Sequence, residues 1–181
     1  LPRAMLARIF GVVAVATAAG GVIFSATTIA MPKLFDERLK ALTDSTLGIG
    51  VLVCLTYLVA AMAQLLVGRL MDRMALRRIF LPVAGMQVPL LVAAALTQNA
   101  LLLAVAVPMM FFIFGQIPIN DAMIAKYTAE AWRARAYAVR YVVSFGASAT
   151  AVPLVAWAHG RYGDFAVLFF ILAACASATF A

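Results

Sequence analysis

Two charged side chains, Asp121 and Arg140, stand inside long apolar stretches of the sequence. A carboxylate in hydrocarbon is costly, so it must face protein, water or a cation. We expect the two stretches to be antiparallel helices that hold both side chains at a similar depth, which makes an ion pair geometrically possible. Unpaired, Asp121 would be a candidate proton-binding site; a permanent pair with Arg140 would keep it ionised and structural.

Uncharged polar side chains accompany this carboxylate. Gln116 and Asn120 are four residues apart and therefore share one face of a helix, and Phe112 continues that face. Amides on a face of an otherwise apolar helix are suited to hydrogen bonding a solute or a neighbouring helix.

A serine nucleophile is an alternative chemistry. The run Gly146-Ala147-Ser148-Ala149 is similar to the nucleophile motif of rhomboid intramembrane proteases, and the chain has one histidine, His159. If the helix continued, eleven residues would separate the two side chains by ~16 Å, beyond hydrogen-bond reach. The final Gly of the motif is also replaced by Ala149, so we do not expect an enzyme.

The composition indicates a membrane protein. Of 181 residues, 66% are hydrophobic and 12% are charged, against roughly 25% charged in soluble domains. The net charge of +7 is concentrated in loops between apolar runs, which argues against a nucleic-acid-binding face. Cys54 and Cys175 lie inside apolar runs without metal-ligand spacing, and no nucleotide-binding loop is present, so we expect no metal and no cofactor.

Six apolar stretches predict an all-α bundle of six transmembrane helices. Small residues interrupt the first stretch at 18–21, which indicates either a close helix contact or a flexible helix beside a substrate cavity. Residues 32–46 are mixed in charge and are expected to form an outside loop. The predicted spans are residues 9–31, 46–68, 79–97, 100–125, 136–157 and 165–181.

A short basic turn joins the second and third spans, from Gly68 to Arg78. Loops rich in Lys and Arg stay on the cytoplasmic side. Ten basic residues fall on the side of this turn and four on the other: Arg3, Arg8, Arg69, Arg73, Arg77, Arg78, Lys126, Arg133, Arg135 and Arg140 against Lys33, Arg38, Lys40 and Arg161. Both ends of the chain are therefore expected in the cytoplasm.

The same turn resembles the loop signature of the major facilitator superfamily, in which Gly, three residues, Asp, Arg, any residue, Gly, any residue and two basic residues follow in order. The matching residues are Gly68, Asp72, Arg73, Arg77 and Arg78. Ala75 stands where the family usually has Gly, which predicts a less tight turn. The resemblance implies one half of a twelve-helix secondary transporter, with the substrate site between two six-helix halves.

By this resemblance, the first and fourth spans line the cavity, the second and fifth face the other half, and the third and sixth are peripheral. The implied substrate-binding residues are Phe24, Ser25, Thr28, Phe112, Gln116 and Asn120. They suit a small organic solute or a drug-like amphiphile. The turn residues would have a gating role, with Asp72 near a positive helix end of the opposite half.

The assignment to a half depends on conflicting features. A full loop signature is usual in the first half, but the fourth span lacks an intramembrane Arg and the fifth lacks a Gly-Pro-x-x-Gly pattern. We therefore expect the carboxy-terminal half, helices 7–12, as a fragment of a longer chain.

The expected function is ion-coupled transport of a small organic solute in the plasma or inner membrane. The expected partners are the lipid bilayer, the missing six-helix half and a small-molecule substrate, without nucleic acid. A membrane scaffold or assembly subunit that moves nothing is the alternative.

Overall fold

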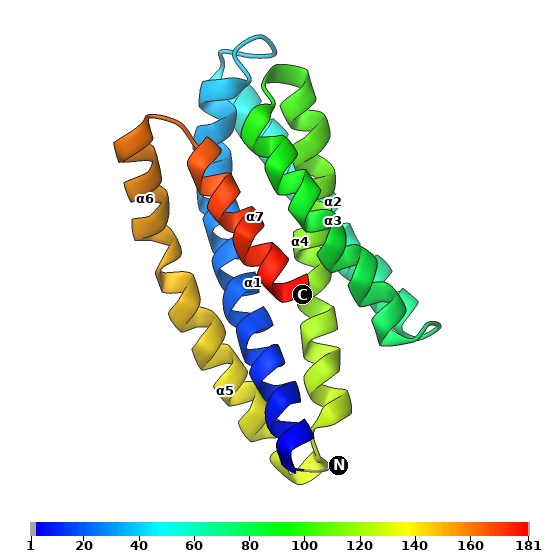
Figure 1. Cartoon of the computed structure of the whole chain (residues 1–181). Coiled ribbons are helices and arrows are strands. Elements are labelled where there is room, and N and C mark those ends of the chain that lie inside the picture. The colour runs from blue at the N-terminus through cyan, green and yellow to red at the C-terminus, as the bar shows by residue number, and fades with distance from the viewer. Residues whose placement is uncertain (1–2, 181) are drawn as a thin grey trace.

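A computed structural model describes residues 3–180, which form helices and no strands. The helices are α1 (Arg3–Arg38), α2 (Thr46–Met71), α3 (Leu76–Leu96), α4 (Asn99–Tyr127), α5 (Glu130–Ala149), α6 (Ala151–Tyr162) and α7 (Ala166–Phe180). Figure 1 shows α5 and α6 following one another along one line. The predicted all-α class is confirmed.

Within the described residues, five helices are long and apolar enough to cross a membrane, α5 and α6 together counting as one. The sixth, α7, is apolar but has only 15 residues, or ~22 Å of helix, less than the ~30 Å hydrocarbon core. This helix matches the predicted span 165–181 to within one residue at its start, and Ala181 lies outside the described part. The helices indicate a multi-pass membrane protein.

The first span is longer than predicted, because the helix continues through Pro32 to Arg38 instead of ending at residue 31. A proline cannot donate to the carbonyl four residues earlier, which here belongs to Thr28. The Tyr57 hydroxyl of α2 donates to that carbonyl at 2.8 Å. With the freed acceptor satisfied by a neighbouring helix, the first span tolerates its proline.

The fifth span also exceeds its prediction, 136–157. Its helix begins at Glu130 and, with one break at Thr150, reaches Tyr162. The break precedes Pro153, which cannot donate to the carbonyl of Ala149. The expected inside loop shrinks to residues 128–129, and Gly163, at φ 66°, ends α6.

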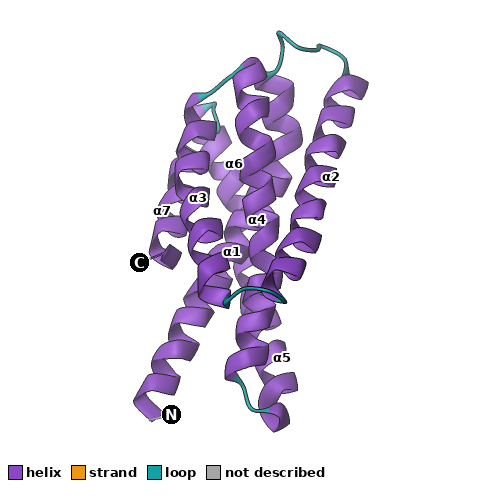
Figure 2. Ribbon diagram, turned by 90° about the vertical axis from the view of Figure 1, so that its right-hand side faces the viewer, coloured by secondary structure: helices purple, strands orange, loops and turns teal. Residues whose placement is uncertain are grey.

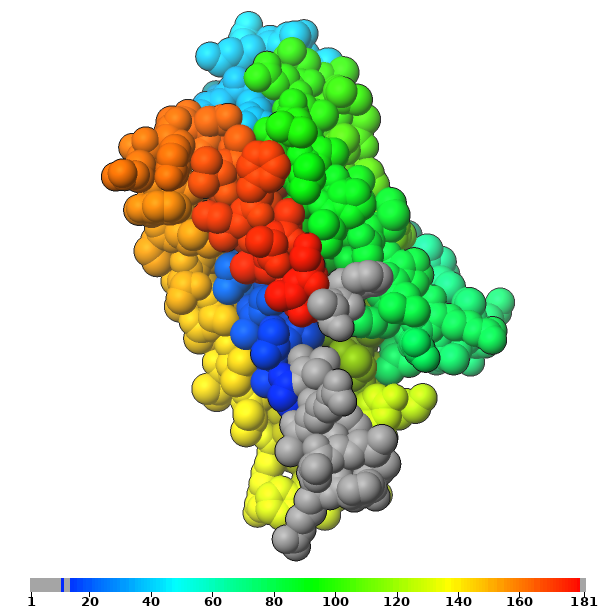
Figure 3. Space-filling model, viewed as in Figure 1, coloured from blue at the N-terminus to red at the C-terminus, as the bar shows by residue number. Residues whose placement is uncertain are grey.

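The helices form an antiparallel bundle (Figures 1 and 2). The start of α1 and the connections at 72–75 and 128–129 lie toward one end, which we call the basic end. The connections at 39–45, 97–98 and 163–165 lie at the opposite, mixed-charge end. Figure 3 shows α7 between α6 and α3 on one face. This alternation matches the predicted order of loops.

The packing is one-sided. Helices α1 and α4 contact each other, α3 contacts α4, and α7 contacts both α1 and α3. Helix α2 packs on α4 and α5 packs on α1, whereas α2 and α5 have no contact within the described chain. The bundle is therefore covered by α3 and α7 on one side of α1 and α4, with α2 and α5 as its flanks.

Candidate functional site

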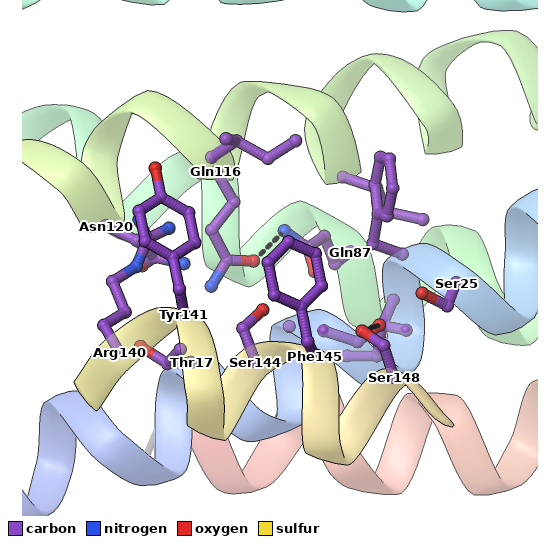
Figure 4. Close-up of a pocket in the computed structure, with 16 residues that line it drawn as sticks. Thr17, Ser25, Gln87, Gln116, Asn120, Arg140, Tyr141, Ser144, Phe145 and Ser148 are labelled. Carbon is purple, nitrogen blue, oxygen red and sulfur yellow. Dashed lines mark hydrogen bonds between the residues drawn. The ribbon is translucent and has the colours of Figure 1, made fainter. Parts of the chain in front are cut away.

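A cavity of about 200 Å³, with polar groups in a mostly apolar lining, lies between α1, α4 and α5, with one contribution from α3 (Figure 4). Its lining combines hydroxyl, amide and aromatic side chains with a single charged residue, Arg140. The polar and aromatic members are Thr17, Phe24, Ser25, Gln87, Gln116, Asn120, Arg140, Tyr141, Ser144, Phe145 and Ser148. Such a collection inside apolar helices is expensive and marks a candidate site.

The glycines of α1 shape this cavity. A Cβ added at Gly21 would lie 2.8 Å from the Ser144 carbonyl oxygen, and the Ser148 hydroxyl donates to the Gly21 carbonyl at 3.1 Å. Helices α1 and α5 are therefore as close as their backbones allow. One residue earlier, a Cβ at Gly20 would meet the amide groups of Asn120 and Gln116 only at 3.8 and 3.9 Å. The small residues of this unbroken helix thus serve close packing and also leave room before two amides.

Hydrogen bonding fixes one of these amides. Gln87 Nε2 donates to Gln116 Oε1 at 2.6 Å and to the Phe112 carbonyl at 3.3 Å. Gln116 is 4% exposed, and its Nε2 has no partner. Asn120 Oδ1 and Thr17 Oγ1 are likewise buried without partners in the described chain. The cavity therefore presents hydrogen-bonding groups that the protein itself does not satisfy.

The ion pair that the sequence allows is present beside the cavity, where Arg140 donates to Asp121. The guanidinium is buried, and Tyr137 donates to the Asp121 carbonyl at 3.0 Å. Arg140 Nε has no partner in the described chain. The pair closes one end of the cavity with a salt bridge that is incompletely hydrogen bonded.

The structure brings together four of the six implied substrate-binding residues: Phe24, Ser25, Gln116 and Asn120 all line the cavity. Thr28 and Phe112 do not. The Thr28 hydroxyl donates to the Phe24 carbonyl at 2.7 Å, within its own helix. Phe112 packs against the cluster of Val67, Ile79, Val83 and Ile119 between α2, α3 and α4. It is eight residues from Asn120, and at ~100° per residue its side chain is rotated by ~80° from that of Asn120 around the helix axis.

Sequence reasoning missed several lining residues. The sequence alone does not single out Gln87 or Ser144, and it offers Ser148 only as a possible nucleophile, yet all three line the cavity. An amide in the middle of an apolar run is a signal that could have identified Gln87, since such groups need partners. The sequence does not predict which helix supplies the partner of Gln87, which the structure shows to be α4.

The basic turn that resembles the family signature, residues 68–78, is largely exposed. Gly68 lies in the last turns of α2, Asp72 follows that helix, and Arg77 and Arg78 begin α3. Asp72, Arg73, Arg77 and Arg78 are exposed, and they make no salt bridge with the side chains that the structure describes, those of residues 11 and 14–179.

Arg38 forms a second charged site, at the mixed-charge end, where a solvated loop was expected. This residue is 9% exposed and pairs with Asp164. Its Nη1 also donates to the carbonyls of Ala94, Ala95 and Thr97 at 3.0, 3.1 and 3.2 Å, where α3 ends. Arg38 therefore ties the ends of α1 and α3 to the start of α7.

The pKa of the Asp164 carboxyl is below its ordinary value. Burial alone would raise this pKa, but the hydrogen bond from Arg38, the Phe165 N–H at 2.7 Å and the charge of Arg38 outweigh it. The carboxylate also sits at the start of α7, where the helix dipole favours negative charge.

The residues considered for serine chemistry have separate partners. Ser148 donates to Gly21, whereas His159 Nε2 lies 3.4 Å from Glu37 Oε1 and its ring stacks on Phe165 with centroids 4.7 Å apart. Both cysteines are free, and no three His, Cys, Asp or Glu side chains gather as metal ligands among the residues described.

Comparison with known proteins finds no family model that matches the chain and no matching curated protein. What the protein does is therefore a question for its cavity and its charged groups.

Proposed function

We propose that the chain is a six-helix half of a secondary transporter of the major facilitator type, which moves a small organic solute by alternating access and is coupled to an ion. The single observation that carries this proposal is a cavity with unpartnered polar groups inside a bundle of apolar helices. Its natural surroundings would be the lipid bilayer of the plasma or inner membrane and a second six-helix half.

The cavity supports transport because its polar groups are otherwise a cost. A buried donor or acceptor left without a partner costs about 1 to 3 kcal/mol, and the amides of Gln116 and Asn120 and the hydroxyl of Thr17 all lack one in the described chain. A scaffold would gain by replacing them with apolar residues. A solute that passes through would satisfy them in turn.

The exposed flanks support a second half. Helix α2 exposes Leu47, Leu55, Leu58 and Leu65, and the long rod α5–α6 exposes Val142, Phe145 and Val152. Since α2 and α5 do not contact each other, these two faces flank α1 and α4 on the side that α3 and α7 leave uncovered. The missing half would dock here and close the cavity, with helix numbers 7–12 assigned to this chain.

The basic turn would then act as a cytoplasmic gate. Gly68 would allow close approach of the other half, and Asp72 would meet a positive helix end there. The exposure of Asp72, Arg73, Arg77 and Arg78 leaves these side chains free for that contact. Both ends of the chain would lie in the cytoplasm, as the positive charges predict.

Ion coupling would use the pair beside the cavity. Asp121 lines up with Arg140 on the adjacent helix, and the pair is near enough to the solute site for Arg140 to line it. A proton on the carboxylate would release Arg140, and so couple protonation to the shape of the cavity.

Cysteine accessibility tests alternating access without knowledge of the substrate. We would place Ser25→Cys, a cavity residue, in the complete protein with Cys54→Ala and Cys175→Ala. A membrane-impermeant maleimide should label this thiol from either side of the membrane, and labelling from one side should block labelling from the other. The control is Ser177→Cys, on an exposed face of α7, which should stay unlabelled.

A scaffold or assembly subunit would give a different pattern. Its Ser25→Cys thiol would be labelled from one side only, or from neither. That result would reject transport by this chain even if the helices and the ion pair are as the structure describes.

A further inference from the structure

The geometry of the cavity points to its solute: we infer that it takes a small uncharged molecule with a carbonyl-type oxygen, which accepts a hydrogen bond from Gln116 Nε2, and an aromatic or flat apolar body. This inference rests on the proposed function only in using the same cavity. It has its own evidence in the orientation of Gln116, the charge of the lining and the aromatic wall.

The orientation of Gln116 follows from its neighbour. The Phe112 carbonyl can only accept, so the Gln87 group that contacts it, at 3.3 Å, must be the NH₂. The same NH₂ lies 2.6 Å from Gln116, whose facing atom must then be the oxygen. Gln116 therefore turns its own NH₂ away from Gln87 and toward α5, as Figure 4 shows. The group that Gln116 offers to a solute is therefore a donor, whose complement is an acceptor oxygen, while Asn120 Oδ1 beside it is an unpartnered acceptor in the described chain.

The charge of the lining favours an uncharged solute. Arg140 is the one charged side chain among the described lining residues, and its charge is matched by Asp121. An anion or a cation in this cavity would lose its hydration without gaining a free countercharge, which is strongly unfavourable. A carboxamide or ketone loses less and recovers its hydrogen bond from Gln116.

Aromatic side chains form the remaining wall. Tyr141 and Phe145 of α5 stack with centroids 5.9 Å apart and an interplanar angle of 19°. Both project over the cavity in Figure 4, and Phe24 of α1 lines it as well. A flat apolar body would find offset or edge contacts with these rings. The volume of about 200 Å³ is below that of sites for drug-sized ligands, which begin at roughly 300 Å³, so the solute portion held here is small.

Three probes of nearly equal size and different charge test the inference: benzamide, benzoate and benzylamine. Equilibrium dialysis of each radiolabelled probe against the complete protein in detergent measures binding without transport. We expect saturable binding of benzamide and weaker binding, by about tenfold or more, of both charged probes. Gln116→Leu should weaken benzamide by about tenfold, the loss expected for one hydrogen bond to a buried donor.

Two further variants make the result specific. Gln64→Leu is the same change on α2, outside the cavity, and should leave benzamide binding unchanged. Gln116→Glu replaces the donor by an acceptor that carries charge, and should reverse the preference toward benzylamine. This reversal would also show that the variant is folded.

Three results would overturn the inference. The unmodified protein could bind benzoate or benzylamine more tightly than benzamide, or show no saturable benzamide binding up to the solubility of this probe. Benzamide binding could also be unchanged by Gln116→Leu. These outcomes are separable from failure of the transport proposal. Benzamide bound through Gln116 in a protein whose Ser25→Cys thiol is labelled from one side would keep this inference and reject transport.

Discussion

Two buried arginines at different places in the bundle show different kinds of ion pair. Arg38 at the mixed-charge end and Arg140 beside the cavity each have side chains 8% exposed, and each pairs with an aspartate. Arg38 also donates to three carbonyls. Arg140 has Asp121 as its hydrogen-bond partner in the described chain, and its Nε has none.

The difference separates a fixed pair from one that can change. Desolvating a guanidinium is offset only when its hydrogen-bonding capacity is used. At Arg38 both terminal nitrogens are used, Nη1 by three backbone carbonyls at the end of α3 and Nη2 by Asp164, so Arg38 holds these parts of the bundle together. Arg140 depends on one carboxylate beside a polar space, so a change there alters one contact and leaves the helices intact.

The largest effect should follow loss of Arg38. Arg38→Leu removes four hydrogen bonds and leaves the carbonyls of Ala94, Ala95 and Thr97, at the end of α3, without this donor. We expect a loss of about 3 to 5 kcal/mol in the free energy of unfolding, because each buried acceptor left without a donor costs about 1 to 3 kcal/mol. The measurement is denaturant titration in detergent micelles. Arg161→Leu, an exposed arginine at the same end, is the matched control and should change stability little. Equal effects of the two substitutions would contradict the structural role of Arg38.

The two arginines also show which ion pairs can be predicted from the sequence. The Asp121–Arg140 pair could be predicted, because charged residues in apolar runs are few and antiparallel helices limit their depth. Arg38 could not, because it follows Pro32 in a stretch of mixed charge that is typical of a loop. The helix continues past Pro32, the freed carbonyl of Thr28 accepts a hydrogen bond from Tyr57, and that donor lies on another helix.

The candidate site divides in the same way. Gln116 and Asn120 follow from spacing within one helix, whereas Thr28 and Phe112 were implied by the family resemblance and lie outside the cavity. The Gln87 contact, which sets the direction of Gln116, joins α3 to α4 and depends on helix rotation that periodicity alone does not give. The helices of the fold are thus largely predictable from local composition, and the lining of the cavity is less so.

The second effect concerns the changeable pair. Asp121→Asn removes the countercharge of Arg140, and we expect a loss of about 1.5 to 3 kcal/mol of stability, the value of a charge-assisted hydrogen bond. If the pair couples an ion, solute uptake into proteoliposomes should also become insensitive to a proton gradient. Uptake that stays proton-coupled in this variant would remove Asp121 from the coupling mechanism, whatever the stability loss.

A smaller effect should come from the packing that holds α5 against α1. Gly21→Ala would bring a Cβ to 2.8 Å from the Ser144 carbonyl oxygen, so the helices must separate, at a cost of about 1 to 3 kcal/mol. The measurement is the same denaturant titration. Gly146→Ala on α5, where an added Cβ meets nothing within 4 Å, should be neutral or slightly stabilising. A neutral Gly21→Ala would show that α5 is not held as closely as the structure describes.

The smallest effect should be a dependence of stability on pH that comes from Asp164 in its pair with Arg38. Because the pKa of Asp164 is lower in the folded protein than in the unfolded chain, its contribution to stability is fully present above the ordinary carboxyl value, near pH 4. That contribution falls as the pH drops below 4 through the folded pKa. Asp164→Asn should therefore be slightly less stable than the unmodified protein at neutral pH, and the difference should narrow on acidification. The loss at neutral pH is small because Arg38 keeps its three carbonyls. A difference that widens as the pH falls would mean that the folded state does not lower the pKa of Asp164. The contact between Arg38 and Asp164 would then not stabilise the bundle through the charge of the carboxylate.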